Sequence, residues 1–274
     1  MTHTQHIGFI GGGNMARSLI GGLQASSAGE YLISCYEPDP ARLATLAHEF
    51  NISPALSNQA LVDTCAVVVL AVKPQVLKQV AQALRVNNNK IPLFITIAAG
   101  IRTTALQRWL GADYAVVRAM PNTPALVRAG ATGMYATNNA TAEQRQLAES
   151  ILRAVGLTLW VNEEPQLDAV TALSGSGPAY FFYLMEAIEK AGVRMGLPAE
   201  TARLLTMETA FGAAKLALEI QEEPAVLRQR VTSPGGTTER AIAVLNENQM
   251  SAVVERALLA ARDRAVELAE QLEK

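Results

Sequence analysis

The amino-acid sequence predicts an α/β fold, in which a doubly wound parallel sheet is followed by an all-helical C-terminal region. Two observations carry this prediction. In the first half of the 274 residues, short continuous apolar runs alternate with helical patterns, and such runs are typical of strands buried on both faces. After the acidic, proline-ended segment 162–165, the strand-like runs stop. We therefore predict two domains, residues 1–164 and residues 165–274.

Seven apolar or β-branched runs are predicted to be strands, and most of the segments between them are long enough for crossover helices. The predicted strands are residues 7–10, 31–36, 66–72, 93–97, 114–118, 133–137 and 158–161. Helices are predicted over residues 14–24, 40–50, 75–84 and 141–155. The last of these is expected to begin with a capping box, because Gln144 follows Thr141 by three residues.

The second half is predicted to be helical over residues 178–192, 198–220, 224–230, 237–245 and 250–272. Helix 250–272 is amphipathic, whereas helix 198–220 is apolar nearly all round. A region of about 110 residues has little interior in which to bury such a helix. We therefore expect helix 198–220 to lie in a subunit interface, and the alternative is that it packs only within its own domain.

Charge and composition argue against several classes of partner. The formal net charge is −2, so there is no electrostatic attraction to nucleic acid or to an anionic membrane. We see no signal peptide and no membrane-spanning run, and we expect a soluble, cytoplasmic protein.

Three histidines without Cys/His spacing predict no metal site. Cys35 and Cys65 lie in or beside predicted strands and are interpreted as buried thiols rather than a redox pair.

The first predicted strand breaks into a glycine turn of the form G-x-G-x-x-A, which ends at Ala16. In such a turn one glycine permits the tight bend and another lets the backbone approach a pyrophosphate, while the final small residue lets helix and strand pack closely. We therefore predict a Rossmann-type domain, and the alternative is an ordinary glycine turn. The residues expected at the dinucleotide are Gly11, Gly12, Gly13, Asn14 and Met15.

Further cofactor contacts are expected where other predicted strands end. Glu37 lies about 20 residues past the glycine turn, where an acid accepts hydrogen bonds from ribose hydroxyls. This chemistry favours NAD, but Arg42 could compensate a 2′-phosphate, so NADH and NADPH both stay open. Ligands of open parallel sheets lie beyond the carboxyl ends of the strands. That rule adds Ala71, Val72, Lys73, Pro74, Ala98, Ala99, Pro121 and Asn122, although Lys73 equally fits a surface lysine.

A loop of small residues, 231–238, opens one of the C-terminal helices. Its backbone N–H groups and the hydroxyls of Thr237 and Thr238 form the kind of loop that holds a small carboxylate. The alternative for the two threonines is simple N-capping of the helix. With the glycine turn, this loop indicates a redox enzyme for a small anionic substrate. Segment 174–178, taken by its residues alone, is interpreted as a flexible linker.

Five segments together resemble the pyrroline-5-carboxylate reductase family: residues 8–15, 71–74, 118–124, 173–180 and 233–238. The resemblance implies that (S)-1-pyrroline-5-carboxylate is reduced to L-proline by NADPH or NADH, which is the last step of proline biosynthesis. It also implies a Rossmann domain followed by a helical dimerisation domain, in homo-oligomers that are commonly decamers.

The resemblance also implies roles for individual residues. The loop would bind the substrate carboxylate through Ser233, Gly235, Gly236 and Thr237. Thr238 would be the catalytic residue that hydrogen-bonds the ring nitrogen, either to orient it or to relay a proton to it. Glu164 matches a position that approaches the substrate, and Asn58 one near the adenosine ribose. The resemblance further implies that segment 174–178 packs near the nicotinamide and positions the substrate against the cofactor. Many members have serine or arginine after the second strand. Glu37 stands there in this chain, which speaks against a strict preference for NADPH.

Two other functions would fit a chain with this glycine turn. A 3-hydroxyacid dehydrogenase of similar build would carry a lysine as its acid/base four residues after a Gly-x-Gly turn, but Phe181 occupies that position here. A dinucleotide-binding protein that has lost catalysis would be expected to have a damaged substrate loop, and loop 233–238 is complete. The reductase chemistry needs no strong acid, because a cyclic imine is basic enough to arrive protonated. Catalysis would depend on holding nicotinamide and imine in reactive geometry.

Overall fold

The computed structural model describes residues 5–26, 30–87 and 90–273. The described residues form two compact units. The first unit runs to Ser176 and includes the residues from Ala261 onward, and the second unit is Gly177–Ala260. Among the described residues, no helix has the length and apolar character needed to cross a lipid bilayer.

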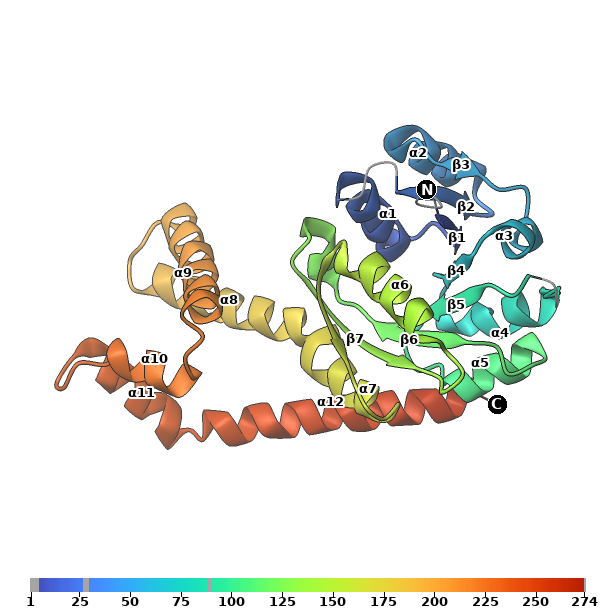
Figure 1. Ribbon diagram of the computed structural model, residues 1–274. Coiled ribbons are helices and arrows are strands. Elements are labelled where there is room, and N and C mark those ends of the chain that lie inside the picture. The colour runs from blue at the N-terminus through green and yellow to red at the C-terminus, as the bar shows by residue number, and fades with distance from the viewer. Residues whose placement is uncertain (1–4, 27–29, 88–89, 274) are drawn as a thin grey trace. The chain divides into compact units, whose positions relative to one another are not determined.

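The strands of the first unit form one eight-stranded sheet in the order β3-β2-β1-β4-β5-β6-β7-β8 (Figure 1). The strands are β1 (Gln5–Ile10), β2 (Tyr31–Tyr36), β3 (Ser53–Pro54), β4 (Val67–Leu70), β5 (Leu93–Thr96), β6 (Val116–Met120), β7 (Gly130–Ala136) and β8 (Gly156–Trp160). Strand β1 lies between β2 and β4 and is parallel to both, so the chain reverses its direction of travel across the sheet at β1. This is the topological switch point at which such sheets bind ligands.

One strand pair departs from the parallel arrangement. Strand β7 is antiparallel to β6, while β8 is again parallel to β7. The physical reason is the connection between β6 and β7, which holds only the short 3₁₀ helix η1 (Thr123–Val127). A parallel return requires a crossover of a dozen or more residues, so this short connection can only reverse the strand.

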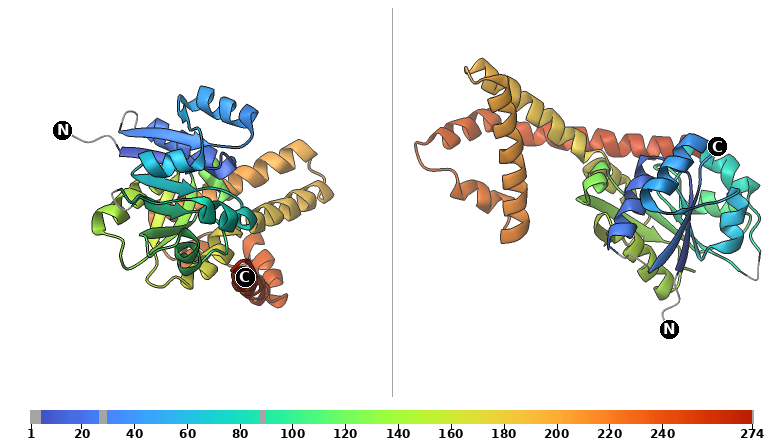
Figure 2. Two further views of the ribbon diagram at one scale, coloured as in Figure 1. Left: turned by 90° about the vertical axis from the view of Figure 1, so that its right-hand side faces the viewer. Right: turned by 90° about the horizontal axis from the view of Figure 1, so that it is seen from above.

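Helices cover both faces of the sheet (Figures 1 and 2). Buried side chains of α1 (Asn14–Ser26), α2 (Pro40–Phe50) and α6 (Ala142–Arg153) join one apolar core. Those of α3 (Asn58–Thr64), α4 (Pro74–Ala83) and α5 (Thr103–Leu110) join the other. Strand β4 shows why: Val67 and Val69 belong to the first core, Val68 and Leu70 to the second. The continuous apolar runs therefore reflect burial on both faces, as predicted.

Local signals set several helix ends. The capping box predicted at Thr141 and Gln144 is confirmed, with both reciprocal hydrogen bonds present at the start of α6. Asp39 caps α2, and Pro40 occupies its first turn. Such ends depend only on residues two or three positions apart, which is why a local sequence pattern can predict them.

The first unit extends beyond the predicted boundary at residue 164. Helix α7 (Gln166–Val170) packs on the sheet with Leu167 fully buried, and a π-helical turn, η2 (Thr171–Gly175), follows it. The final turns of α12 (Met250–Leu272) also belong to this unit, where Leu272 lies against Gly100. The contact boundary thus differs from the division at residue 164, which stays a prediction about functional domains.

The second unit is helical, as predicted. It contains α8 (Gly177–Arg194), α9 (Ala199–Ile220), α10 (Pro224–Arg230), α11 (Thr237–Glu247) and the first part of α12. Helices α8 and α9 pack side by side (Figure 2). Within α9 only Ala202 and Thr206 are buried in the single chain. Large apolar side chains stay exposed on both helices: Phe181, Phe182, Leu204, Leu205 and Phe211.

Candidate functional site

The glycine turn joins β1 to α1 and has the geometry of a phosphate cradle. Gly11 has a φ of +100°, and a Cβ atom there would lie 2.8 Å from the carbonyl oxygen of Ala71, so only glycine fits. Around Gly13, a Cβ atom would meet nothing within 4 Å, which leaves open space above the turn. Helix α1 begins at Asn14 with no acidic side chain in its first turn. Its N-terminal N–H groups are therefore suited to an anion.

Glu37 lies directly against this turn. Its side chain is 8% exposed, and its Oε2 atom accepts a hydrogen bond of 2.8 Å from the backbone N–H of Gly12. Its Oε1 atom accepts a second bond, 3.2 Å long, from the backbone N–H of Asp39. The guanidinium of Arg42 lies 3.6 Å from Oε1. Sequence spacing predicted that Glu37 accepts from the ribose hydroxyls of a cofactor. The structure places Glu37 against the glycine turn, and its contact with a ribose stays a prediction.

The other predicted cofactor residues follow the carboxyl ends of β4, β5 and β6, which are neighbours in the sheet. Ala71 continues the pairing with β1 by donating to the Ile10 carbonyl at 2.8 Å. Lys73 is exposed at the N-cap of α4, Ala98 is buried, and Ala99 is half-buried. Asn58 stands at the start of α3, and its buried Oδ1 atom has no hydrogen-bond partner among the described residues. An unpartnered buried acceptor fits a site that a ligand hydroxyl completes.

Asn122 serves the fold as well as the site edge. Its Oδ1 atom accepts from the N–H of Ala131, and its Nδ2 group donates to the carbonyl of Ser174. The segment containing Ser174 is thereby held at the end of β6, and a Cβ atom on Gly175 would lie 2.6 Å from the Cε atom of Met120. The interpretation of segment 174–178 as a flexible linker is wrong, because its first two residues complete the π-helical turn η2 and Gly177 and Pro178 begin α8. That packing depends on residues some fifty positions away.

A buried charge cluster lies beside this sheet edge, and only one of its members was predicted. Arg118 on β6 is 3% exposed and contacts Glu164 at 3.1 Å and Asp168 at 3.6 Å. Arg102 pairs with Asp168 at 2.5 Å. Glu164 also accepts from the N–H and the hydroxyl of Thr103, both at 2.8 Å. Two cations thus face two carboxylates, which is how buried charges are tolerated.

This cluster bears on the predicted role of Glu164. Both of its carboxylate oxygens are engaged by Thr103 and Arg118, which fix the start of α5 just beyond Ala98 and Ala99. Those bonds support a positioning role, and a direct contact with substrate stays a prediction. The sequence did carry a signal for Arg118, since it is the single charge in an otherwise apolar strand.

The loop 233–238 lies in the second unit and opens α11. Gly235 has a φ of +70°, which favours glycine, and Gly236 occupies the N-cap position. Among the described residues no side chain caps this helix, so neither Thr237 nor Thr238 serves as an N-cap. Ser233 and Thr237 are exposed, and Thr238 is half-buried. The N–H of Gly236 donates to the Ser233 carbonyl at 3.0 Å.

An acidic side chain already occupies one amide of this loop. The N–H of Gly235 donates to Oε2 of Glu239 at 2.7 Å. Sequence reasoning did not single out Glu239, although an acid at the third position of a helix commonly reaches back to the preceding amides. In the geometry that the loop adopts here, the N–H of Gly235 is thus placed to donate to a carboxylate oxygen.

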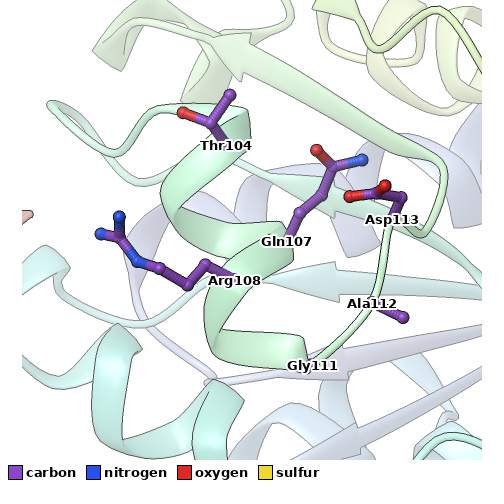
Figure 3. Close-up of a pocket in the computed structure, with 6 residues that line it drawn as sticks. All are labelled: Thr104, Gln107, Arg108, Gly111, Ala112 and Asp113. Carbon is purple, nitrogen blue, oxygen red and sulfur yellow. The ribbon is translucent and has the colours of Figure 1, made fainter.

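The two cysteines and a surface hollow lie outside the predicted site residues. Cys35 and Cys65 are free and buried, which confirms their interpretation as buried thiols, and burial together with the Glu37 charge raises the pKa of Cys35 to about 12. A hollow at the carboxyl end of α5 is lined by residues such as Gln107, Arg108 and Asp113 (Figure 3). It precedes β6, at the edge opposite the strand carboxyl ends, and contains none of the predicted site residues. No group of three potential metal-ligand side chains occurs in the described ranges.

Comparison with known proteins gives matches over the whole chain. A family model described as pyrroline-5-carboxylate reductase dimerisation matches residues 164–268, and one described as NADP oxidoreductase coenzyme F420-dependent matches residues 6–100. The pyrroline-5-carboxylate reductase of Pseudomonas aeruginosa is 52% identical over 98% of each chain. That of Escherichia coli is 39% identical, also over 98% of each chain.

Solved structures agree with these matches. A pyrroline-5-carboxylate reductase from Coxiella burnetii is 44% identical, with a TM-score of 0.91 over 97% of this chain and 99% of that one. A Plasmodium falciparum pyrroline carboxylate reductase with NADP bound is 26% identical, with a TM-score of 0.84 over 97% and 98% of the two chains.

Proposed function

Because this chain belongs to the pyrroline-5-carboxylate reductase family, we infer that it reduces (S)-1-pyrroline-5-carboxylate to L-proline with a hydride from NADPH or NADH. This reaction is the last step of proline biosynthesis, and the chain is an NAD(P)H-dependent oxidoreductase. The observation that carries the function is the extent of the similarity. It covers 98% of the chain at 52% identity, and so includes both the glycine turn and loop 233–238.

The cofactor is assigned to the edge of the sheet around β1. The open space above Gly13 and the start of α1 suit the pyrophosphate, and Glu37 and Asn58 suit the adenosine ribose. Residues 71–74, 98–99 and 121–122, which follow the neighbouring strands, are proposed to flank the nicotinamide. When bound, the reduced nicotinamide supplies the hydride, and the surrounding residues hold it in place.

Loop 233–238 is proposed to hold the substrate carboxylate. The contact between the N–H of Gly235 and the Glu239 carboxylate supports this role, because the substrate presents the same functional group. In this proposal the substrate carboxylate replaces Glu239 on Gly235 and gains the N–H of Thr237 at the start of α11. The Ser233 hydroxyl, which is exposed, is the third proposed donor.

Thr238 is proposed as the catalytic residue through its hydroxyl. A cyclic imine is reduced most readily once its nitrogen is protonated, and it is basic enough to arrive in that form. The chain therefore needs a group that orients the ring nitrogen rather than a strong acid. Since Thr238 has no capping duty in α11, its hydroxyl is available for this role. The expected gain comes from holding the imine carbon and the hydride donor in reactive geometry.

The chain forms homo-oligomers through its family's dimerisation region, residues 164–268, and the exposed apolar faces of α8 and α9 are consistent with this. Assembly into decamers is our proposal, as is a cytoplasmic location, which the pool of reduced nucleotides there and the two free cysteines support.

An initial-rate assay tests the function. The purified protein is mixed with pyrroline-5-carboxylate and either NADH or NADPH, and both nucleotide oxidation and L-proline formation are followed. We expect stoichiometric turnover with at least one nucleotide. Oxidation of 3-hydroxyisobutyrate-type substrates without reduction of pyrroline-5-carboxylate would instead identify a 3-hydroxyacid dehydrogenase. Nucleotide binding without any turnover would identify a catalytically inactive binding protein.

A further inference from the structure

The segment between β2 and α2, residues 37–42, lacks the donors that a phosphate group requires. In folds of this kind the residues after the second strand face the 2′ position of the adenosine ribose. Pro38 and Pro40 have no backbone N–H. The N–H of Asp39 donates to Oε1 of Glu37 at 3.2 Å. The N–H groups of Ala41 and Arg42 both donate to Oδ1 of Asp39, at 3.0 and 3.2 Å.

Every backbone donor from residue 38 to residue 42 is therefore either absent or bonded to a carboxylate of the same segment. A 2′-phosphate is bound by N–H donors and basic side chains. A 2′-hydroxyl needs only one acceptor, and the Glu37 carboxylate is such an acceptor. The segment therefore suits a ribose 2′-hydroxyl better than a 2′-phosphate.

The charges of this segment point the same way. Glu37 is 8% exposed and cannot easily turn away, because the N–H of Gly12 holds its Oε2 atom at 2.8 Å. Asp39 adds a second carboxylate at the exposed start of α2. Arg42 is the single cation in the segment, and it already lies 3.6 Å from Glu37. A 2′-phosphate would meet two carboxylates and one partly neutralised guanidinium, so like-charge repulsion disfavours it.

We propose that Glu37, supported by Asp39, makes this reductase select NADH over NADPH, with the carboxylate accepting from the ribose 2′-hydroxyl and repelling a 2′-phosphate. The proposal depends on the cofactor site assigned above to the glycine turn. It sets this chain apart from the Plasmodium falciparum relative, whose structure has NADP bound.

Direct binding tests the selection without relying on turnover. NADH and NADPH are titrated separately into the wild-type oligomer, and binding is followed by isothermal titration calorimetry. We expect the Kd for NADPH to exceed that for NADH at least tenfold. Equal affinities, or tighter binding of NADPH, in a protein that still reduces pyrroline-5-carboxylate would overturn the selection alone. Binding of neither nucleotide would overturn the cofactor site as well.

Three substitutions sharpen the test. Glu37→Gln keeps an oxygen for the Gly12 N–H but removes the charge, and we expect it to reduce the Kd ratio at least tenfold. Asp39→Asn retains a good N-cap at an exposed position and should reduce the ratio by a smaller factor, even if the buried Glu37 variant folds poorly. Glu49→Gln makes the same change on α2, where Glu49 pairs with Arg17, and should leave the ratio unchanged. An unchanged ratio in both Glu37→Gln and Asp39→Asn contradicts the proposal.

Discussion

At the residue scale, the neighbours of Thr238 leave its hydroxyl without a role in capping the helix. Helix α11 begins at Thr237 after the N-cap Gly236, and no side chain caps it. Glu239 instead satisfies the amide of Gly235. Because the loop is held by backbone and by Glu239, the Thr238 hydroxyl has no structural task in these contacts. Its proposed role in orienting the ring nitrogen therefore predicts a kinetic effect that is separable from folding.

Thr238→Ala is expected to lower kcat by roughly 10- to 100-fold, because a hydrogen bond to a charged group contributes about 1.5–3 kcal/mol. Affinity for the reduced nucleotide, measured by calorimetry, should stay within about a factor of two of wild type on the same reasoning. Thr238→Ser retains the hydroxyl and should recover most of kcat. Equal losses in kcat and in nucleotide affinity would show that Thr238 only supports the helix.

At the scale of elements, the last strand of the sheet, β8, pairs with β7 through a close backbone contact between two glycines. Strand β8 begins at Gly156, which pairs with Gly130 of β7. Gly156 has a φ of +145°, and a Cβ atom there would lie 2.1 Å from the Gly130 carbonyl oxygen. Both the dihedral angle and the neighbouring backbone demand glycine. Strand β7 also contacts α7, because Val170 and Leu167 pack against Gly133. Helix α7 carries Asp168 of the buried charge cluster.

Gly156→Ala is expected to destabilise the protein by roughly 3 kcal/mol or more, because backbone strain and overpacking add. Gly111→Ala is the matched control. Gly111 also has a positive φ, +87°, but a Cβ atom there would meet nothing within 4 Å, so only about 1 kcal/mol of strain is expected. Thermal unfolding midpoints at one fixed protein concentration compare the two. Similar midpoints for both variants would mean that the close approach to Gly130 adds no measurable destabilisation.

At the scale of the whole molecule, the second unit is incomplete as a single chain. Helices α8 and α9 expose large apolar side chains and enclose a groove of about 650 Å³ lined by residues such as Met185, Ile188 and Leu205. Large exposed apolar surfaces mark interaction sites. Homo-oligomerisation through the dimerisation region accounts for them, and it explains why α9 is apolar nearly all round.

Leu205→Glu is therefore expected to dissociate the oligomer, because it places a charge on a surface that association would bury. Size-exclusion chromatography with light scattering would show a lower mass at micromolar concentration. Leu157→Glu is a matched control, because Leu157 on β8 is 57% exposed and Leu205 is 55% exposed, but it lies in the first unit. An unchanged mass for Leu205→Glu would place the interface elsewhere.

Much of the candidate site could be predicted from the sequence because its signals are local. The glycine turn, the acid at Glu37 and loop 233–238 each depend on a few consecutive residues or on one strand–helix spacing. The carboxyl ends of β1, β4, β5 and β6 could be grouped because parallel strands share one orientation. Helix ends such as the capping box at Thr141 follow from residues three positions apart.

Other features depend on tertiary structure. Arg118 meets Glu164 and Asp168 across more than forty residues, and Asn122 anchors Ser174 across fifty-two. The reversal of β7 against β6 and the return of the α12 end to the first unit belong to the same class. Hydrophobic periodicity states which side of an element is buried, and local motifs state how it begins. Neither signal identifies the distant residue with which a buried charge will pair. That pairing is set only when the elements pack together and exclude water around the charges.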